Sequence, residues 1–160
     1  MIAGLRIGTE DLPQIDADVA ALSSTSLALG REIGGVLGND TLRSRILQID
    51  YPRRRLRLLP DAPPTPPGAL VRPMKYVDGS HVPMLEDVVT VNGKNIPVAL
   101  DTGAYSAITI GTVTLAAREV TLSGRPGPIG SNMGRLGNLG LAQFVVTLNY
   151  RDGQLVLLKP

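Results

Sequence analysis

The 160-residue sequence lacks cysteine and tryptophan, and it contains one histidine, His81, and one phenylalanine. Without cysteine the chain can form neither disulfides nor thiolate metal sites, which leaves its compartment open. No metal-ligand spacing, Gly-rich phosphate loop or Ser/His/Asp set is present. We therefore expect no metal and no cofactor, and we expect His81 to lie in a surface loop. Aromatic residues make up 3% of the chain, so its core has to be aliphatic.

Long apolar runs and a strong net charge are also missing. No uninterrupted apolar run approaches 18 residues, and the first ten residues lack the basic start and apolar core of a secretory signal. The net charge is +2, and the basic run 53–57 is typical of a charged turn that leads into an alternating strand. We expect a soluble chain with no nucleic-acid and no membrane partner. A periplasmic or secreted location would require a signal upstream of Met1.

Glycine and proline are abundant, with 18 and 13 residues, and 43% of the chain is hydrophobic. This composition is typical of a folded domain and favours many short strands joined by turns over long helices. The sequence therefore predicts a mainly β fold with one or two short helices. One of these is expected within 16–35 and would end at Gly30 or Gly34.

An internal repeat organises the chain. Residues 36–59 match residues 135–158 without a gap at an offset of 99 positions, through a shared Leu-Gly-Asn, a shared Tyr and a shared closing Leu-x-Leu-Leu. Each copy predicts one or two helical turns, a strand, a turn and a final strand. These elements are expected at 40–45, 46–51, 52–54 and 56–59 in the first copy, and at 139–144, 145–150, 151–153 and 155–158 in the second.

A proline-rich segment separates the two copies. Residues 60–73 contain six prolines, so they cannot hold a helix or an inner strand and are predicted to be an extended linker. We expect three parts: a partial lobe at 1–59, a linker at 60–81 and a longer lobe at 82–160. The longer lobe should open with a hairpin of strands 88–91 and 96–100 around Asn92-Gly93, and 113–122 should hold a further hairpin or two short strands.

The sequence 96–110, IPVALDTGAYSAITI, places Asp101 at the end of an apolar strand. This stretch resembles the active-site loop of retropepsin-like and pepsin-like aspartic proteases, and the repeat resembles the C-terminal part of each lobe in bacterial two-lobed proteins of this kind. The resemblance implies an acid-protease fold. It also implies that the protein hydrolyses a peptide or protein substrate. It implies that Asp101 is a catalytic carboxylate. By the same resemblance Thr102, Gly103 and Ala104 support the loop, with the Thr102 hydroxyl locking paired loops, and Leu136 and Gly137 pack beneath it.

The chain also departs from this pattern. No second Asp-Thr-Gly or Asp-Ser-Gly is present, and the position 99 residues before Asp101 is Ile2. The first repeat is expected to be the back half of a lobe, so a partner carboxylate would come from a homodimer or from a half-lobe upstream of Met1. Arg135 replaces the first apolar residue of the element that precedes Gly137, and only 31 residues separate it from Gly103.

Two alternatives remain open on the sequence alone. Asp101 could be a turn or cap residue whose carboxylate accepts backbone N–H bonds. The chain could also be a non-catalytic, protease-like module that binds peptides or mediates assembly.

Overall fold

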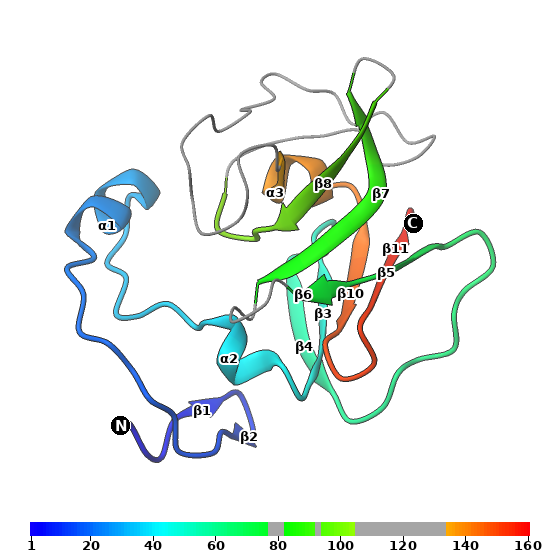
Figure 1. Ribbon diagram of the computed structural model, residues 1–160. Coiled ribbons are helices and arrows are strands. Elements are labelled where there is room, and N and C mark those ends of the chain that lie inside the picture. Colours follow the sequence, from blue (N-terminus) through cyan, green and yellow to red (C-terminus); the bar gives the residue numbers. More distant parts are fainter. Residues whose placement is uncertain (77–81, 92–93, 105–133) are drawn as a thin grey trace. The chain divides into compact units, whose positions relative to one another are not determined.

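A computed structural model describes residues 1–76, 82–91, 94–104 and 134–160 (Figure 1). The chain divides into a first unit, Met1–Leu42, and a second unit, Arg43–Pro160. The described elements are mainly β-strands, which confirms the predicted fold class at that level. Among the described residues, no helix is long and apolar enough to cross a membrane.

The first unit has little core of its own. Its strands β1 (Arg6–Ile7) and β2 (Glu10–Asp11) pair antiparallel, and an isolated bridge joins Ile2 to Ile15. Helix α1 (Ser23–Leu29) buries none of its residues and ends at Gly30, whose φ of 64° is left-handed. Of the two predicted ends, Gly30 and Gly34, the helix takes the first, where glycine adopts this conformation without a side-chain clash. A second short helix, α2, follows at Asn39–Leu42.

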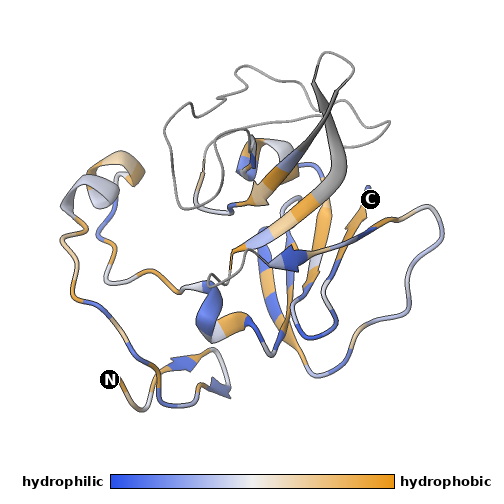
Figure 2. Ribbon diagram, viewed as in Figure 1, coloured by the Kyte–Doolittle hydropathy of each residue, from blue (hydrophilic) through white to orange (hydrophobic). Residues whose placement is uncertain are grey.

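The second unit contains a five-stranded antiparallel sheet in the order β4-β3-β10-β11-β5. Its strands are β3 (Ile46–Asp50), β4 (Arg55–Leu59), β5 (Leu70–Pro73), β10 (Val145–Asn149) and β11 (Gln154–Leu158). In Figure 2 the strands β10 and β11 are mostly hydrophobic and the turn between them is hydrophilic. On one face of β10 and β11 the side chains are fully buried, as for Val146, Leu148 and Leu155, each 0% exposed. This face carries the hydrophobic core of the sheet.

The two repeats have the same structure, residue for residue. The elements α2 and α3 (Asn138–Leu141), β3 and β10, and β4 and β11 each begin and end 99 positions apart. We call β3–β4 the first hairpin and β10–β11 the second hairpin. The predicted strands are confirmed, while the helices begin one residue earlier than expected and are shorter.

A local two-fold axis relates the two hairpins. Strands β3 and β10 lie side by side with Gln48 opposite Thr147, which are equivalent positions of the repeat, and the Gln48 amide donates to the Thr147 hydroxyl at 3.2 Å. Two backbone bonds then form a reciprocal pair across this axis. Tyr51 N–H donates to Phe144 C=O at 3.4 Å, and Tyr150 N–H donates to Arg45 C=O at 3.1 Å. The duplicated sequence therefore supplies four adjacent, symmetry-related strands of the five-stranded sheet, β4-β3-β10-β11.

The turns of the two hairpins are also equivalent. The Asp50 carboxylate accepts the Arg53 N–H, and the Asn149 side-chain oxygen accepts the Asp152 N–H, each at 3.0 Å. Slight burial acts to raise the Asp50 pKa, but the hydrogen bonds from Arg53 and nearby positive charge lower it overall.

The last residue of each turn is left-handed, with φ 53° at Arg54 and 65° at Gly153. The predicted charged turn in the first copy is thus confirmed, although arginine occupies a position that favours glycine.

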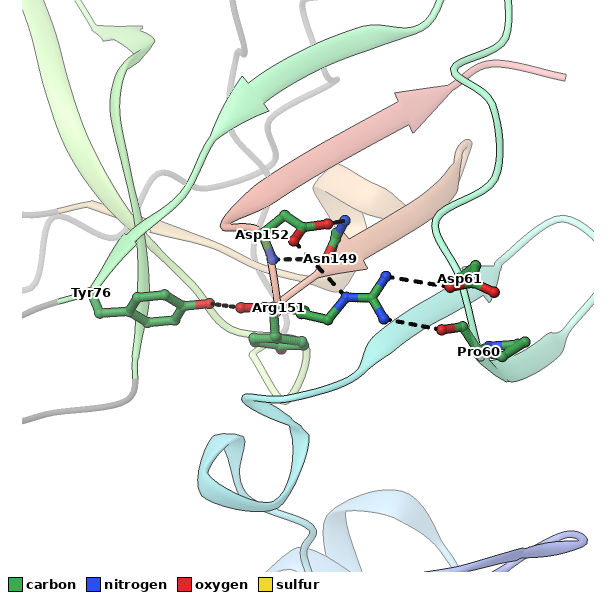
Figure 3. A network of polar contacts seen from close by, with 7 residues as sticks. Pro60, Asp61, Tyr76, Asn149, Arg151 and Asp152 are labelled. Atoms are coloured by element: carbon green, nitrogen blue, oxygen red, sulfur yellow. Dashed lines mark hydrogen bonds and ion pairs between the residues drawn. The ribbon is translucent and has the colours of Figure 1, made fainter.

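The second turn is anchored to the rest of its unit (Figure 3). The Arg151 guanidinium donates to Pro60 C=O at 3.2 Å and lies 3.7 Å from the Asp61 carboxylate. On the other side, the Tyr76 hydroxyl donates to the Tyr150 carbonyl at 3.0 Å, and Met74 N–H donates to Gly153 C=O at 2.7 Å. These contacts fix both ends of the proline-rich segment to one turn.

A four-stranded sheet in the order β6-β7-β8-β9 precedes α3. Its strands are β6 (Lys75–Tyr76), β7 (Pro83–Val91), β8 (Lys94–Leu100) and β9 (Gly134–Leu136). Strands β7 and β8 form the predicted hairpin, with an irregular register between Leu85 and Val89, and β8 pairs with β9 in parallel. The predicted turn residues Asn92 and Gly93 and the segment 113–122 lie outside the described residues.

The predicted linker is partly structured. Its last residues form β5, which is an edge strand, so the prediction that 60–73 holds no inner strand is confirmed. Pro73 ends β5 opposite Gln154, a place at the sheet edge where proline is tolerated. Strand β6 also falls within 60–81. The division into lobes at 1–59 and 82–160 stays a prediction.

Candidate functional site

Asp101 directly follows the last residue of β8, an inner strand of the four-stranded sheet. The last residues of the strand are buried, with Val98 at 0% and Leu100 at 4% exposure, and β9 lies beside them in parallel. The Asp101 N–H donates to Leu136 C=O at 2.9 Å, which continues the β8–β9 pairing by one residue. The backbone of Asp101 is therefore fixed by the sheet, while its side chain is only partly buried.

Residues 101–104 form a tight turn that is tied to the start of α3. Ala104 N–H donates to Asp101 C=O at 3.1 Å, and Asn138 N–H donates to Ala104 C=O at 2.8 Å. The Asn138 side-chain amide donates to Thr102 C=O. Asn138 thus donates to two of the loop carbonyls.

Each oxygen of the Asp101 carboxylate has its own partner. Oδ1 accepts the Gly103 N–H at 2.9 Å, the local bond of an Asx-turn. Oδ2 forms an ion pair with Arg135 Nη1 at 3.0 Å, with side-chain exposures of 36% and 57%. Among the described residues, none of the partners of Asp101 is a carboxylate. The turn-residue role considered above is therefore present, alongside a charge contact that the sequence did not predict.

Gly103 lies close to the carboxylate that it binds. A Cβ atom at position 103 would lie 3.2 Å from Asp101 Oδ1, closer than ordinary van der Waals contact. The carboxylate would have to move or lose its bond to the backbone. The absence of a side chain at position 103 therefore gives the carboxylate room for this bond.

The other predicted site residues take different positions. Leu136 is 0% exposed and Gly137 is buried directly before α3, next to the Asp101 turn. Thr102 is exposed, and Ala104 is half-buried. The structure thus brings Asp101, Ala104, Leu136 and the start of α3 together, and it leaves Thr102 at the surface. His81, which was predicted to lie in a surface loop, is outside the described residues.

Tyr51 links the first repeat to this loop. Its hydroxyl donates to Asn138 Oδ1 at 2.6 Å, and burial raises the pKa of Tyr51 to about 12. Neither Tyr51 nor Asn138 was assigned a role in the loop from the sequence. The recurring Leu-Gly-Asn of the repeat was the signal that could have identified Asn138.

A pocket lies elsewhere in the second unit, between the proline-rich segment and the five-stranded sheet. It is lined by small or uncharged residues: Gln48, Ala62, Pro63, Pro64, Thr65, Pro66, Val145, Thr147, Asn149, Gln154, Val156 and Leu158. No ionisable side chain lines it, so it offers hydrogen bonds and apolar contact but no acid–base group. The Asp101 loop is the better candidate for chemistry, because it carries a partly exposed carboxylate.

Comparisons with known proteins give no relative. No family model matches the chain, and no curated protein or solved structure matches it either. Within the described residues, no group of three or more His, Cys, Asp or Glu could hold a metal ion. The function has to be argued from the loop itself.

Proposed function

We propose that this chain is an aspartic-type peptidase, or part of one, in which Asp101 is one of two catalytic carboxylates. The observation that carries the proposal is the Asp101–Gly103 turn. A buried strand fixes the backbone of an aspartate whose carboxylate is oriented by the Gly103 N–H and remains partly exposed. Pre-oriented, solvent-accessible carboxylates are suited to activating a bound water. The resemblance of the loop and of the repeat to acid proteases agrees with this role.

The chemistry requires a second carboxylate close to Asp101. Two carboxylates at close range hold one proton between them, because their like charges disfavour double ionisation. The ionised one takes a proton from water as the water attacks the scissile carbonyl, and the protonated one polarises that carbonyl. The partner would come from a second copy of the chain or from sequence outside these 160 residues.

Arg135 sets a condition on this mechanism. Its guanidinium lies 3.0 Å from Oδ2, the carboxylate oxygen that the turn does not use. A partner carboxylate approaching this oxygen would have to displace Arg135 or share it. Since both side chains are partly exposed, the ion pair is weak enough to be exchanged. We infer that a monomer in which this ion pair is formed is inactive, and that activity requires the partner carboxylate to exchange with Arg135.

The same ion pair favours a second candidate function. If Arg135 stays in place, the loop is a protease-like module that binds peptides or mediates assembly without hydrolysis. The charge of Asp101 is then neutralised by Arg135, and the turn serves only to shape the surface.

The test is hydrolysis of an unbiased peptide mixture by the full chain at acidic pH, followed by mass spectrometry. The peptidase proposal expects cleavage that a statine-type transition-state mimic blocks and that Asp101→Asn abolishes. Asp11→Asn is the matched control, since Asp11 also forms an exposed ion pair, with Arg6 at 2.7 Å. Cleavage retained in Asp101→Asn would refute the assignment. Peptide binding without cleavage at every protein concentration would favour the non-catalytic module.

A further inference from the structure

The two hairpins pair their strands in the same register, but their outer strands differ in how far they are buried. Leu155 and Leu157 of β11 are 0% and 2% exposed, whereas the equivalent Leu56 of β4 is 56% exposed and Leu58 is half-buried. The outer edge of β11 is paired with β5. Among the described residues, no strand pairs with the outer edge of β4, which is the end of the sheet. The local two-fold axis therefore relates a covered edge to an open one.

The open edge has a regular chemical pattern. Arg55 and Arg57 lie on one face of β4, and Leu56 and Leu58 lie on the other, since successive residues of a strand alternate. Arg55 is opposite Asp50 in the neighbouring strand, but Arg57 is opposite the neutral Gln48. Within the described part of the chain, Arg57 has no ion-pair partner. The Asp50 carboxylate forms its ion pair with Arg53 instead, so the edge offers two cations, Arg55 and Arg57, that alternate with two leucines.

We propose that β4 binds an extended partner strand that alternates carboxylate and aliphatic side chains. The second hairpin supplies the geometry, because β5 pairs antiparallel with β11 and places Leu70 opposite Leu157. A strand in the equivalent place on β4 would set carboxylates opposite Arg57 and Arg55 and aliphatic residues opposite Leu56 and Leu58. Addition of a strand to an open edge gains main-chain hydrogen bonds, and the side-chain pattern selects the partner.

A second copy of this chain is the less suitable occupant. Antiparallel pairing of β4 with the same strand of another copy would bring arginines opposite or diagonal to one another. Like charges at such positions are unfavourable, and basic edge strands are a common way to prevent this pairing. The charge of the edge therefore selects an acidic strand and disfavours the chain's own β4.

The experiment uses the full chain and a blocked, fluorescent peptide that alternates valine and aspartate. Its control is the same peptide with lysine in place of aspartate. Binding is followed by fluorescence anisotropy, and the backbone amides that gain protection are located by hydrogen exchange. We expect the aspartate peptide to bind about tenfold more tightly than the lysine peptide, from the pairing of opposite charges across strands, with new protection in β4.

Charge reversal provides the decisive comparison. Arg57→Glu is expected to reverse the preference in favour of the lysine peptide, while Arg31→Glu, which changes an exposed arginine of the first unit, should leave it unchanged. Because Arg57 is exposed, the variant should fold, and its circular dichroism spectrum checks this. Equal binding of both peptides, or protection outside β4, would overturn the proposal. Concentration-dependent protection of β4 without any peptide would overturn it in favour of a second copy.

Discussion

At the scale of single residues, the Asp101 carboxylate divides its two oxygens between two tasks. Oδ1 holds the turn through the Gly103 N–H, and Oδ2 meets Arg135. The first contact is local and independent of the rest of the molecule. The second joins the ends of two parallel strands that are far apart in sequence. An exchange of partners at Oδ2 can thus occur without disturbing the turn.

Gly103→Ala tests the close approach in this turn. The added Cβ, 3.2 Å from Oδ1, should displace the carboxylate and cost about 1 kcal/mol, which lowers the Tm by roughly 2–4 °C. Thermal unfolding measures the change. Gly34→Ala is the control, because a Cβ at position 34 meets no atom within 4 Å. An equal effect in both variants would show that the carboxylate contact is unimportant.

Tyr51→Phe tests the link between the first repeat and the loop. It removes the 2.6 Å bond to Asn138 and should destabilise the fold by about 1 kcal/mol. Tyr76→Phe removes a comparable hydroxyl bond to the Tyr150 carbonyl and serves as the control. Only Tyr51→Phe should shift the NMR amide signals of residues 102–104. Unshifted signals there would contradict the proposed coupling.

At the scale of elements, the two hairpin turns differ at one informative position. Gly153 is left-handed, and a Cβ there would lie 3.1 Å from the Met74 carbonyl, next to the end of β5. Arg54 has the same left-handed conformation in the first hairpin. Since no counterpart of β5 pairs with β4 among the described residues, a side chain fits at position 54. The composition of each turn follows from what packs beside it.

Opposite changes in these turns should have opposite effects on stability. Arg54→Gly removes the backbone strain of a left-handed non-glycine residue. This gain should exceed the conformational entropy cost of the added glycine, so we expect the Tm to rise by about 1–3 °C. Gly153→Ala should lower the free energy of unfolding by about 2 kcal/mol, because it adds both strain and a close contact. Thermal and urea unfolding of the two variants measure this. Changes of the same sign would contradict the account.

The elements were largely predictable, because each depends on local pattern. Alternating aliphatic residues predict β3, β8, β10 and β11, Gly30 predicts the end of α1, and the repeat predicts that α2 and α3 are equivalent. Strand β5 was not predicted, since proline content dominated the interpretation of its segment. Its pairing with β11 is a tertiary effect that local preference does not encode.

The candidate site was predicted only in part. The sequence identified the Asp101 turn and the part of Gly103 in it, both of which are local. It did not predict that Arg135 pairs with Asp101, because this contact depends on the parallel alignment of β8 and β9. Nor did it predict the Tyr51–Asn138 bond, which joins residues 87 positions apart.

At the scale of the whole molecule, buried tyrosines set the alkaline limit of stability. Burial raises the pKa of Tyr51 to about 12, and burial together with nearby Tyr76 raises that of Tyr150 to about 12, against about 10 in an unfolded chain. The neutral form is favoured in the fold, so this contribution is complete below pH 10 and is lost between pH 10 and about 12. Across this pH range the urea midpoint of unfolding should fall while the tyrosinate absorbance rises. Ionisation of all tyrosines near pH 10 with no loss of stability would contradict this expectation.

The local two-fold axis also fixes an order of folding events. Each hairpin closes over a four-residue turn, whereas the Gln48–Thr147 contact between them closes a segment of 99 residues. By loop-closure entropy the long closure costs about 3 kcal/mol more than a hairpin turn. The hairpins should therefore form early and join late. Asp101 lies within the segment that this last step encloses. The loop is therefore linked to Tyr51, through Asn138, only when the two halves of the duplication meet.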